Sequence, residues 1–278
     1  MFEHKVIPLD LWISDAVDWL VTNYRSFFQA IKWPVEKTLA GFDAGLNMLH
    51  PIIVIALLVF IAWKFSGKAL AAFTAISLVL VGMLGLWSDT MTTLAMVLSS
   101  VIFCAAVGIP LGIAAGRSDR IEQGIRPILD AMQTTPSFVY LVPIVMLFSV
   151  GNVAGVLSTI VFAMPPIIRL TSLGIRQVHP ELVEAALAFG ASRGQVLLKV
   201  QVPLAMPTIL AGLNQTIMMA LAMVVIAALI GAGGLGAPVV LGLNTLDIGL
   251  AVIAGLSIVL LAMVLDRITQ SMAGKSGS

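Results

Sequence analysis

Ionisable and polar side chains are scarce in this chain, so the few that cluster away from its ends are the first candidates for chemistry. One cluster is the stretch 184–203, EAALAFGASRGQVLLKVQVP, which carries Glu184, Arg193 and Lys199. The other is the uncharged polar run at residues 214–216. A charged stretch can bind a partner through ion pairs and hydrogen bonds. An uncharged polar run within an apolar segment can line a solute path or bind a neighbouring helix.

The sequence shows no set of residues typical of a catalytic or metal site. His4, His50 and His179 lack the spacing of metal ligands, and no nucleophile with a base and an acid can be recognised. Residues 231–236 match the dinucleotide fingerprint by letter, but an apolar run precedes them where the fingerprint needs a strand, so a glycine-rich turn is the better interpretation. A Walker A motif is absent. We therefore expect a chain that holds no cofactor and does not hydrolyse ATP itself.

The charged stretch at residues 184–203 is expected to form two short helices joined by a turn. Good helix formers precede Gly190, and glycine tolerates the positive φ angles that a tight turn requires. The second helical piece runs from Arg193 to Val200, and we expect Pro203 to end it because proline lacks an N–H donor. The prediction is a helix, a turn and a helix in a loop between two apolar spans.

The composition places the chain in a membrane. Its mean hydropathy is +1.06. Of its 278 residues 10% are charged, compared with about 25% in a soluble domain. A single globular core cannot bury so much apolar surface, so lipid must be the solvent of most of the chain. The net charge of +1 favours no nucleic acid partner, and the lone Cys104 excludes an intrachain disulfide.

Apolar runs predict seven membrane spans behind an amphipathic N-terminal region. In residues 11–31 apolar side chains recur every three or four positions, which predicts a helix lying in the membrane interface, with a break at Trp33–Pro34. The third span carries Gly108, Gly112 and Gly116, a spacing that lets two helices approach closely. The spans are expected near residues 46–63, 69–87, 91–116, 135–150, 153–172, 206–231 and 247–266.

The basic residues are unevenly distributed between the two sides of these spans. The short loops around Asp89, Asn152 and Asn244 hold none. Since short cytoplasmic loops are enriched in Lys and Arg, we expect the 184–203 stretch and the C-terminus on the cytoplasmic side of the inner membrane. With seven spans, the N-terminus is then expected outside. The basic residues on the predicted cytoplasmic side are Lys64, Lys68, Arg117, Arg120, Arg126, Arg169, Arg176, Arg193, Lys199, Arg267 and Lys275.

Uncharged polar residues in and beside the predicted spans allow two interpretations. Asn214, Gln215 and Thr216 stand together in the sixth span, and Gln133 and Thr134 precede the fourth. A polar group facing lipid is costly, so these side chains should face the interior of the bundle. They would either line the path of a zwitterionic or cationic solute or bind neighbouring helices through hydrogen bonds. The sequence supports both interpretations equally.

The charged stretch resembles the EAA loop of the membrane subunits of ABC importers. Glu184-Ala185-Ala186 is followed after three residues by Gly190 and after nine more by Val200-x-Val202-Pro203, where the family usually has leucine in place of Val202. The resemblance implies that this loop docks into a groove on an ATPase subunit and couples ATP hydrolysis to transport. The residues that it assigns to coupling are Glu184, Ala185, Ala186, Gly190, Arg193, Lys199 and Pro203.

Three further segments, residues 130–147, 161–177 and 212–236, resemble the permease subunits of the glycine betaine/proline betaine/choline ABC importers. The resemblance implies an all-α integral membrane protein with the type I importer (MetI-like) fold. It also implies a second permease copy, two cytoplasmic ATPase subunits that hold ATP and magnesium, and a substrate-binding protein outside the membrane. The expected domains are an interfacial region at 1–45, accessory spans at 46–87, the importer domain at 88–270 with its loop at 180–203, and a tail at 271–278.

The predicted function is that of a permease subunit for ATP-driven uptake of a quaternary-amine solute such as glycine betaine, proline betaine or choline. A secondary transporter of the same solutes is the first alternative. It would need no docking loop and would usually have more spans or an internal inverted repeat, neither of which the sequence shows. An integral membrane enzyme is the second alternative, and the missing catalytic set disfavours it.

Overall fold

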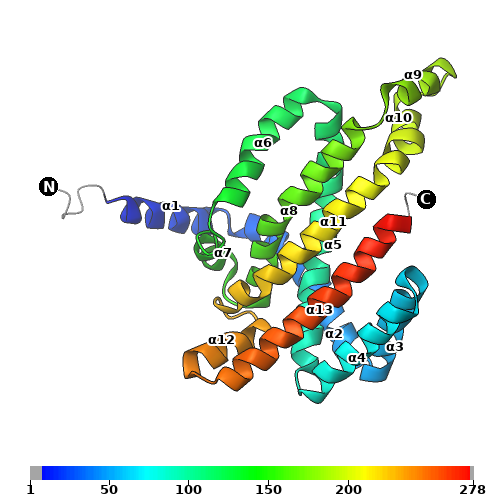
Figure 1. The fold of residues 1–278 in the computed structure, drawn as a ribbon. Coiled ribbons are helices and arrows are strands. Elements are labelled where there is room, and N and C mark those ends of the chain that lie inside the picture. Colours follow the sequence, from blue (N-terminus) through cyan, green and yellow to red (C-terminus); the bar gives the residue numbers. More distant parts are fainter. Residues whose placement is uncertain (1–7, 276–278) are drawn as a thin grey trace.

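The computed structural model describes residues 8–275, and every regular element in that range is a helix (Figure 1). The long helices α5, α8 and α11 pack together at the centre, with α13 beside α11 (Figure 1). The prediction of an all-α membrane fold is confirmed. The elements are α1 (Leu9–Asn23), α2 (Arg25–Met48), α3 (Pro51–Ser66), α4 (Lys68–Met83), α5 (Trp87–Arg117), α6 (Asp119–Thr134), α7 (Leu141–Phe148), α8 (Asn152–Arg176), α9 (Pro180–Ala188), α10 (Arg193–Val196), the π-helical turn η1 (Leu197–Gln201), α11 (Val202–Ala228), α12 (Gly236–Thr245) and α13 (Ile248–Lys275).

The glycine stripe of α5 lies directly against α8, as its spacing predicts. A Cβ atom added at Gly112 would come within 2.5 Å of the Thr171 Cβ and 2.7 Å of the Ile168 carbonyl oxygen. One added at Gly108 would come within 2.5 Å of a methyl group of Ile167. The two backbones are therefore closer than any side chain on this face of α5 would allow, and the contact depends on van der Waals packing.

Gly112→Ala is expected to destabilise the protein, because its methyl group must displace the backbone of α8. Overpacking of this kind costs about 1–3 kcal/mol. We expect a thermal unfolding midpoint lowered by several degrees in detergent. The matched control is Gly124→Ala on α6, where an added Cβ meets nothing within 4 Å and alanine has the better helix propensity. Equal unfolding midpoints for the two variants would contradict the close α5–α8 contact.

The chain runs between two ends of the bundle, which we call the loop end and the far end. The loop end holds α9 and α10 with the last residues of α5, α8 and α13 (Figure 1). There Arg176 Nη2 donates to the Ala115 carbonyl oxygen over 2.8 Å. The far end holds α12 and the turns that precede α5 and α8 (Figure 1). There Gly151 N donates to the Ile230 carbonyl oxygen over 3.0 Å.

The glycine-rich segment at residues 231–236 is the turn between α11 and α12, as predicted. Gly231 and Gly234 have φ angles of +77° and +75°. Gly233 N donates to Asn152 Oδ1 over 2.6 Å, which fixes the turn to the start of α8 at the far end.

Not all of the seven predicted spans are helices long and apolar enough to cross a membrane. Four helices are long and apolar enough to cross a membrane, or five if the pair α2 and α3, bent by 107°, is one span. The predicted span at 135–150 is wrong as a continuous helix, because it forms a turn and the eight-residue α7, about 12 Å long. α3 and α4 have 16 residues each, or about 24 Å against a hydrocarbon core of about 30 Å. The count of seven full-length spans is therefore too high.

The N-terminal region forms two helices that meet at Tyr24, so the predicted break at Trp33–Pro34 is wrong. Pro34 lies inside α2. Val35 and Leu39 of the same helix are buried in a cluster with residues of α5 and α8, and this packing outweighs the hydrogen bond that proline removes. α1 projects from the bundle (Figure 1) with its apolar side chains largely exposed. Of the predicted interfacial region and tail, residues 1–7 and 276–278 lie outside the described residues.

Candidate functional site: the loop-end hairpin and the cleft beside it

The charged stretch forms a hairpin of α9 and α10, and the turn at its centre requires a glycine. α9 ends at Ala188, and Gly190 has a φ angle of +82°. Gly190 N donates to the Leu187 carbonyl oxygen over 2.9 Å, and Ala191 N donates to the Ala186 carbonyl oxygen over 3.1 Å. These are the two hydrogen bonds of a Schellman motif. A side chain at position 190 would meet no neighbouring atom, but its backbone would be strained.

The second helix of the hairpin starts with a capping box. The prediction that it ends at Pro203 is wrong. Ser192 N donates to Gln195 Oε1 over 2.8 Å, and Gln195 N donates to Ser192 Oγ over 3.3 Å. From α10 the helix passes through η1 into α11, so residues 193–228 form one helix. The π-helical turn lies directly before Pro203, and its wider coil relieves the clash between a proline ring and the preceding turn.

The hairpin projects beyond the loop end of the bundle and exposes both apolar and charged side chains (Figure 1). Phe189, beside the turn, is 93% exposed, and Leu187 and Leu198 are exposed as well. A large exposed aromatic side chain among charges is typical of a docking face for another protein. Of the residues predicted to take part in coupling, Glu184, Ala185, Gly190, Arg193, Lys199 and Pro203 are exposed and Ala186 is half-buried.

The polar run of α11 is divided between helix packing and the surface. Asn214 Nδ2 donates to Asp266 Oδ1 of α13 over 3.1 Å, and the Thr269 hydroxyl donates to Asn214 Oδ1. Gln215 is exposed, and Thr216 is buried without a hydrogen-bond partner among the described residues. Asn214 therefore binds α11 to α13, which favours the interhelical interpretation for this side chain.

Gln133 and Thr134 are exposed at the end of α6, and the structure does not bring them together with the polar run of α11. α6 packs against α5 and α8, whereas Asn214 faces α13. Figure 1 shows α6 and α13 on opposite sides of the central helices. Within one copy of the chain, the five predicted pathway residues therefore do not line a single surface.

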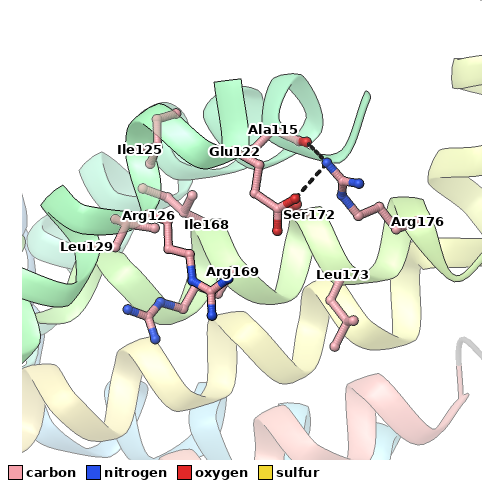
Figure 2. A pocket seen from close by; sticks show the side chains of 10 residues that line it. All are labelled: Ala115, Glu122, Ile125, Arg126, Leu129, Ile168, Arg169, Ser172, Leu173 and Arg176. Carbon is pink, nitrogen blue, oxygen red and sulfur yellow. Dashed lines mark hydrogen bonds and ion pairs between the residues drawn. The ribbon is translucent and has the colours of Figure 1, made fainter. Parts of the chain in front are cut away.

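A further group of charged residues, which the sequence did not identify as a site, surrounds a cleft of about 330 Å³ between α6 and α8 (Figure 2). Ion pairs tie the two helices together around it. Arg176 lies 2.6 Å from Asp119 and 2.7 Å from Glu122, and Arg169 lies 2.6 Å from Asp130. The carboxylates all come from α6 and the two guanidinium groups from α8, so the ion pairs add to the packing of the buried Leu129 that holds α6 on the bundle.

The sequence does contain a signal for this cleft. Glu122, Arg126 and Asp130 are four residues apart, a spacing that places them on one face of a helix. Residues 117–126 are expected from the sequence to lie in a loop between two spans, and a row of charged side chains in a loop does not indicate a binding site. Among residues 8–275, no three His, Cys, Asp or Glu side chains gather closely enough to hold a metal ion.

The described chain is thus a bundle of apolar helices from which an exposed hairpin projects at one end. A family model described as "Binding-protein-dependent transport system inner membrane component" matches residues 108–275. The chain belongs to this family. It is the permease subunit of an ABC importer.

Relatives that match along almost the whole of this chain agree with this assignment. The chain is 53% identical over 277 residues to the glycine betaine/proline betaine transport system permease protein ProW of Escherichia coli, covering 100% of this chain and 78% of that protein. It is 45% identical over 272 residues to the glycine betaine transport system permease protein OpuAB of Bacillus subtilis, covering 98% and 96%.

A solved structure of the MetNI methionine ABC transporter in an inward-facing conformation matches with a TM-score of 0.60. The match covers 66% of this chain and 92% of that chain at 22% identity, so it bears on the fold alone. The predicted type I, MetI-like fold is confirmed.

Proposed function

We propose that this permease carries a small quaternary-amine solute into the cytoplasm and that the α9–α10 hairpin docks on a separate ATPase subunit. The solute class rests on the relatives, which are named for glycine betaine and proline betaine. The docking role rests on one observation, the almost complete exposure of Phe189 beside the turn at Gly190. The positive φ angle of this turn suits glycine and would strain other residues. An aromatic side chain so exposed gains free energy when a partner buries it.

The assembly that we propose contains two copies of the permease, two cytoplasmic ATPase subunits that hold ATP and magnesium, and a substrate-binding protein at the far end. No nucleic acid takes part, and this chain itself holds no cofactor. The loop end and the C-terminus face the cytoplasm, and α1 and α2 face outside. Basic residues support this orientation, because Arg117, Arg176, Arg193 and Lys199 lie at the ends of α5 and α8 and in the hairpin, whereas the far-end loops around residues 89, 152 and 244 carry none.

Polar side chains of α6 and α11 are the candidates for lining the path of the solute. Asn214 is assigned to helix packing because of its hydrogen bonds to α13. Gln215, Gln133 and Thr134 remain candidate pathway residues, because exposed polar side chains at membrane depth must face water, protein or a second copy of the chain. Thr216 also remains a candidate, because its buried hydroxyl has no hydrogen-bond partner among the described residues.

Cysteine labelling tests the orientation and the docking role together. In a background with Cys104→Ala, we expect Ser192→Cys to resist a membrane-impermeant thiol reagent in intact cells and Asn244→Cys to react. In inside-out vesicles Ser192→Cys should react, and the ATPase subunit should protect it. Labelling of Ser192→Cys from outside intact cells would refute the orientation. Equal labelling in vesicles with and without the ATPase subunit would refute docking at the hairpin.

A further inference from the structure

The cleft between α6 and α8 contains polar groups that the folded chain leaves without partners. Arg126 lines the cleft and forms no ion pair or hydrogen bond with another described residue. Ser172 also lines it; the residue is only 5% exposed, yet its hydroxyl has no hydrogen-bond partner among residues 8–275. A buried hydroxyl without a partner costs free energy. A ligand that brings an anionic oxygen would satisfy the Ser172 hydroxyl and could pair with Arg126, which is exposed to water at the rim of the cleft.

The positive groups converge at one part of this cleft. Figure 2 shows the side chains of Arg126 and Arg169 reaching into the cleft from α6 and α8 respectively. Arg169 has a single carboxylate partner, Asp130, and both side chains of that pair are about half exposed. Guanidinium groups are suited to carboxylates, which they can bind through two parallel hydrogen bonds. Ile125, Leu129 and Ile168 give the cleft an apolar wall.

The position of the cleft argues that its ligand comes from water rather than from lipid. α6 is the first half of a pass between the two ends of the bundle, yet it carries the charged face described above. A polar helix at membrane depth must face protein or a water-filled cavity. The cleft also lies near Ala115 and Arg176, close to the loop end, which is the exit side in the proposed orientation.

We propose that this cleft is an exit-side subsite that receives the carboxylate of the transported solute. Arg126 and Ser172 bind the carboxylate oxygens, and the apolar wall receives the methyl groups of the quaternary amine. The inference rests on the proposed function, because it takes its ligand from the solute class. A volume of about 330 Å³ equals the liquid volume of about ten water molecules, enough for such a solute.

Protection from alkylation tests the subsite without the binding protein or ATP. Leu173→Cys, with Cys104→Ala, places a thiol on the cleft wall. The permease–ATPase complex in nanodiscs of zwitterionic phospholipid is treated with N-ethylmaleimide. Glycine betaine should slow the reaction, whereas choline, which has a hydroxyl group in place of the carboxylate, should not. Arg126→Gln and Ser172→Ala should each raise the half-protecting glycine betaine concentration, by at least about tenfold for Arg126→Gln, the factor for one lost charge-assisted hydrogen bond.

The matched control is Arg120→Gln, which removes an exposed arginine of α6 that does not line the cleft, and it should leave protection unchanged. Equal protection by choline, or protection that survives Arg126→Gln, would overturn the proposal. The proposal would also be overturned if added phosphatidylglycerol blocked the labelling and glycine betaine had no effect. That result would identify the cleft as a site for a lipid headgroup. The unfolding midpoint of Arg126→Gln should equal that of the parent. If glycine betaine fails to protect the parent Leu173→Cys complex while ATP-driven uptake is intact, the subsite alone is refuted. Absence of ATP-driven uptake by the parent complex refutes the proposed function.

Discussion

Gly190→Asp is expected to abolish solute uptake while leaving the membrane-spanning part of the protein intact. The φ angle of +82° at this position strains any residue with a Cβ atom, by about 1–3 kcal/mol. The substitution also places a negative charge beside Phe189, the most exposed aromatic side chain of the hairpin. Because about 1.4 kcal/mol is a factor of ten in an equilibrium, strain and charge together should lower ATPase binding and uptake by at least about tenfold. Co-purification of the ATPase and uptake into vesicles measure the two effects.

Three variants separate the causes. Gly194→Asp adds the same charge four residues away, in the first turn of α10, where an added Cβ meets nothing within 4 Å and a carboxylate suits the helix dipole. It should retain most of the activity. Gly190→Asn should be milder than Gly190→Asp, because asparagine tolerates positive φ. Glu184→Ala should also be milder, because it removes a charge without straining the turn. Normal uptake and normal assembly with Gly190→Asp would show that the hairpin is not the coupling element.

The parts of the fold that sequence predicts well are those set by local chemistry. Long apolar runs identify α5, α8, α11 and α13, and the glycine stripe of α5 identifies a close helix contact. The sequence predicts only part of the pass made by α6 and α7, as a span at 135–150, because a charged segment such as 119–134 is expected to be a loop. This segment stays on the bundle through the burial of Leu129 in the main core, to which the partly exposed ion pairs of Arg169 and Arg176 add. Such pairings between distant segments leave no local pattern in a sequence.

The candidate site shows the same division. The turn at Gly190 was predictable, since a glycine between two helical pieces indicates a positive φ angle. The continuation of the helix past Pro203 was not, because a proline usually ends a helix and no local pattern indicates the widened turn η1 that precedes it. The partner of Asn214 is Asp266, 52 residues away. The sequence therefore supports a solute path and hydrogen bonds between helices equally well for this polar run. Only the structure favours the second interpretation for Asn214.

The central claim is that this permease moves its solute only when an ATPase subunit, docked on the α9–α10 hairpin, hydrolyses ATP. The most direct test is uptake of radiolabelled glycine betaine into vesicles that contain the purified permease, with the substrate-binding protein outside. We predict accumulation only when the ATPase subunit and ATP are also enclosed, and no ATP hydrolysis by the permease alone. Accumulation by the permease without the ATPase subunit, driven by an ion gradient, would contradict the account and identify a secondary transporter.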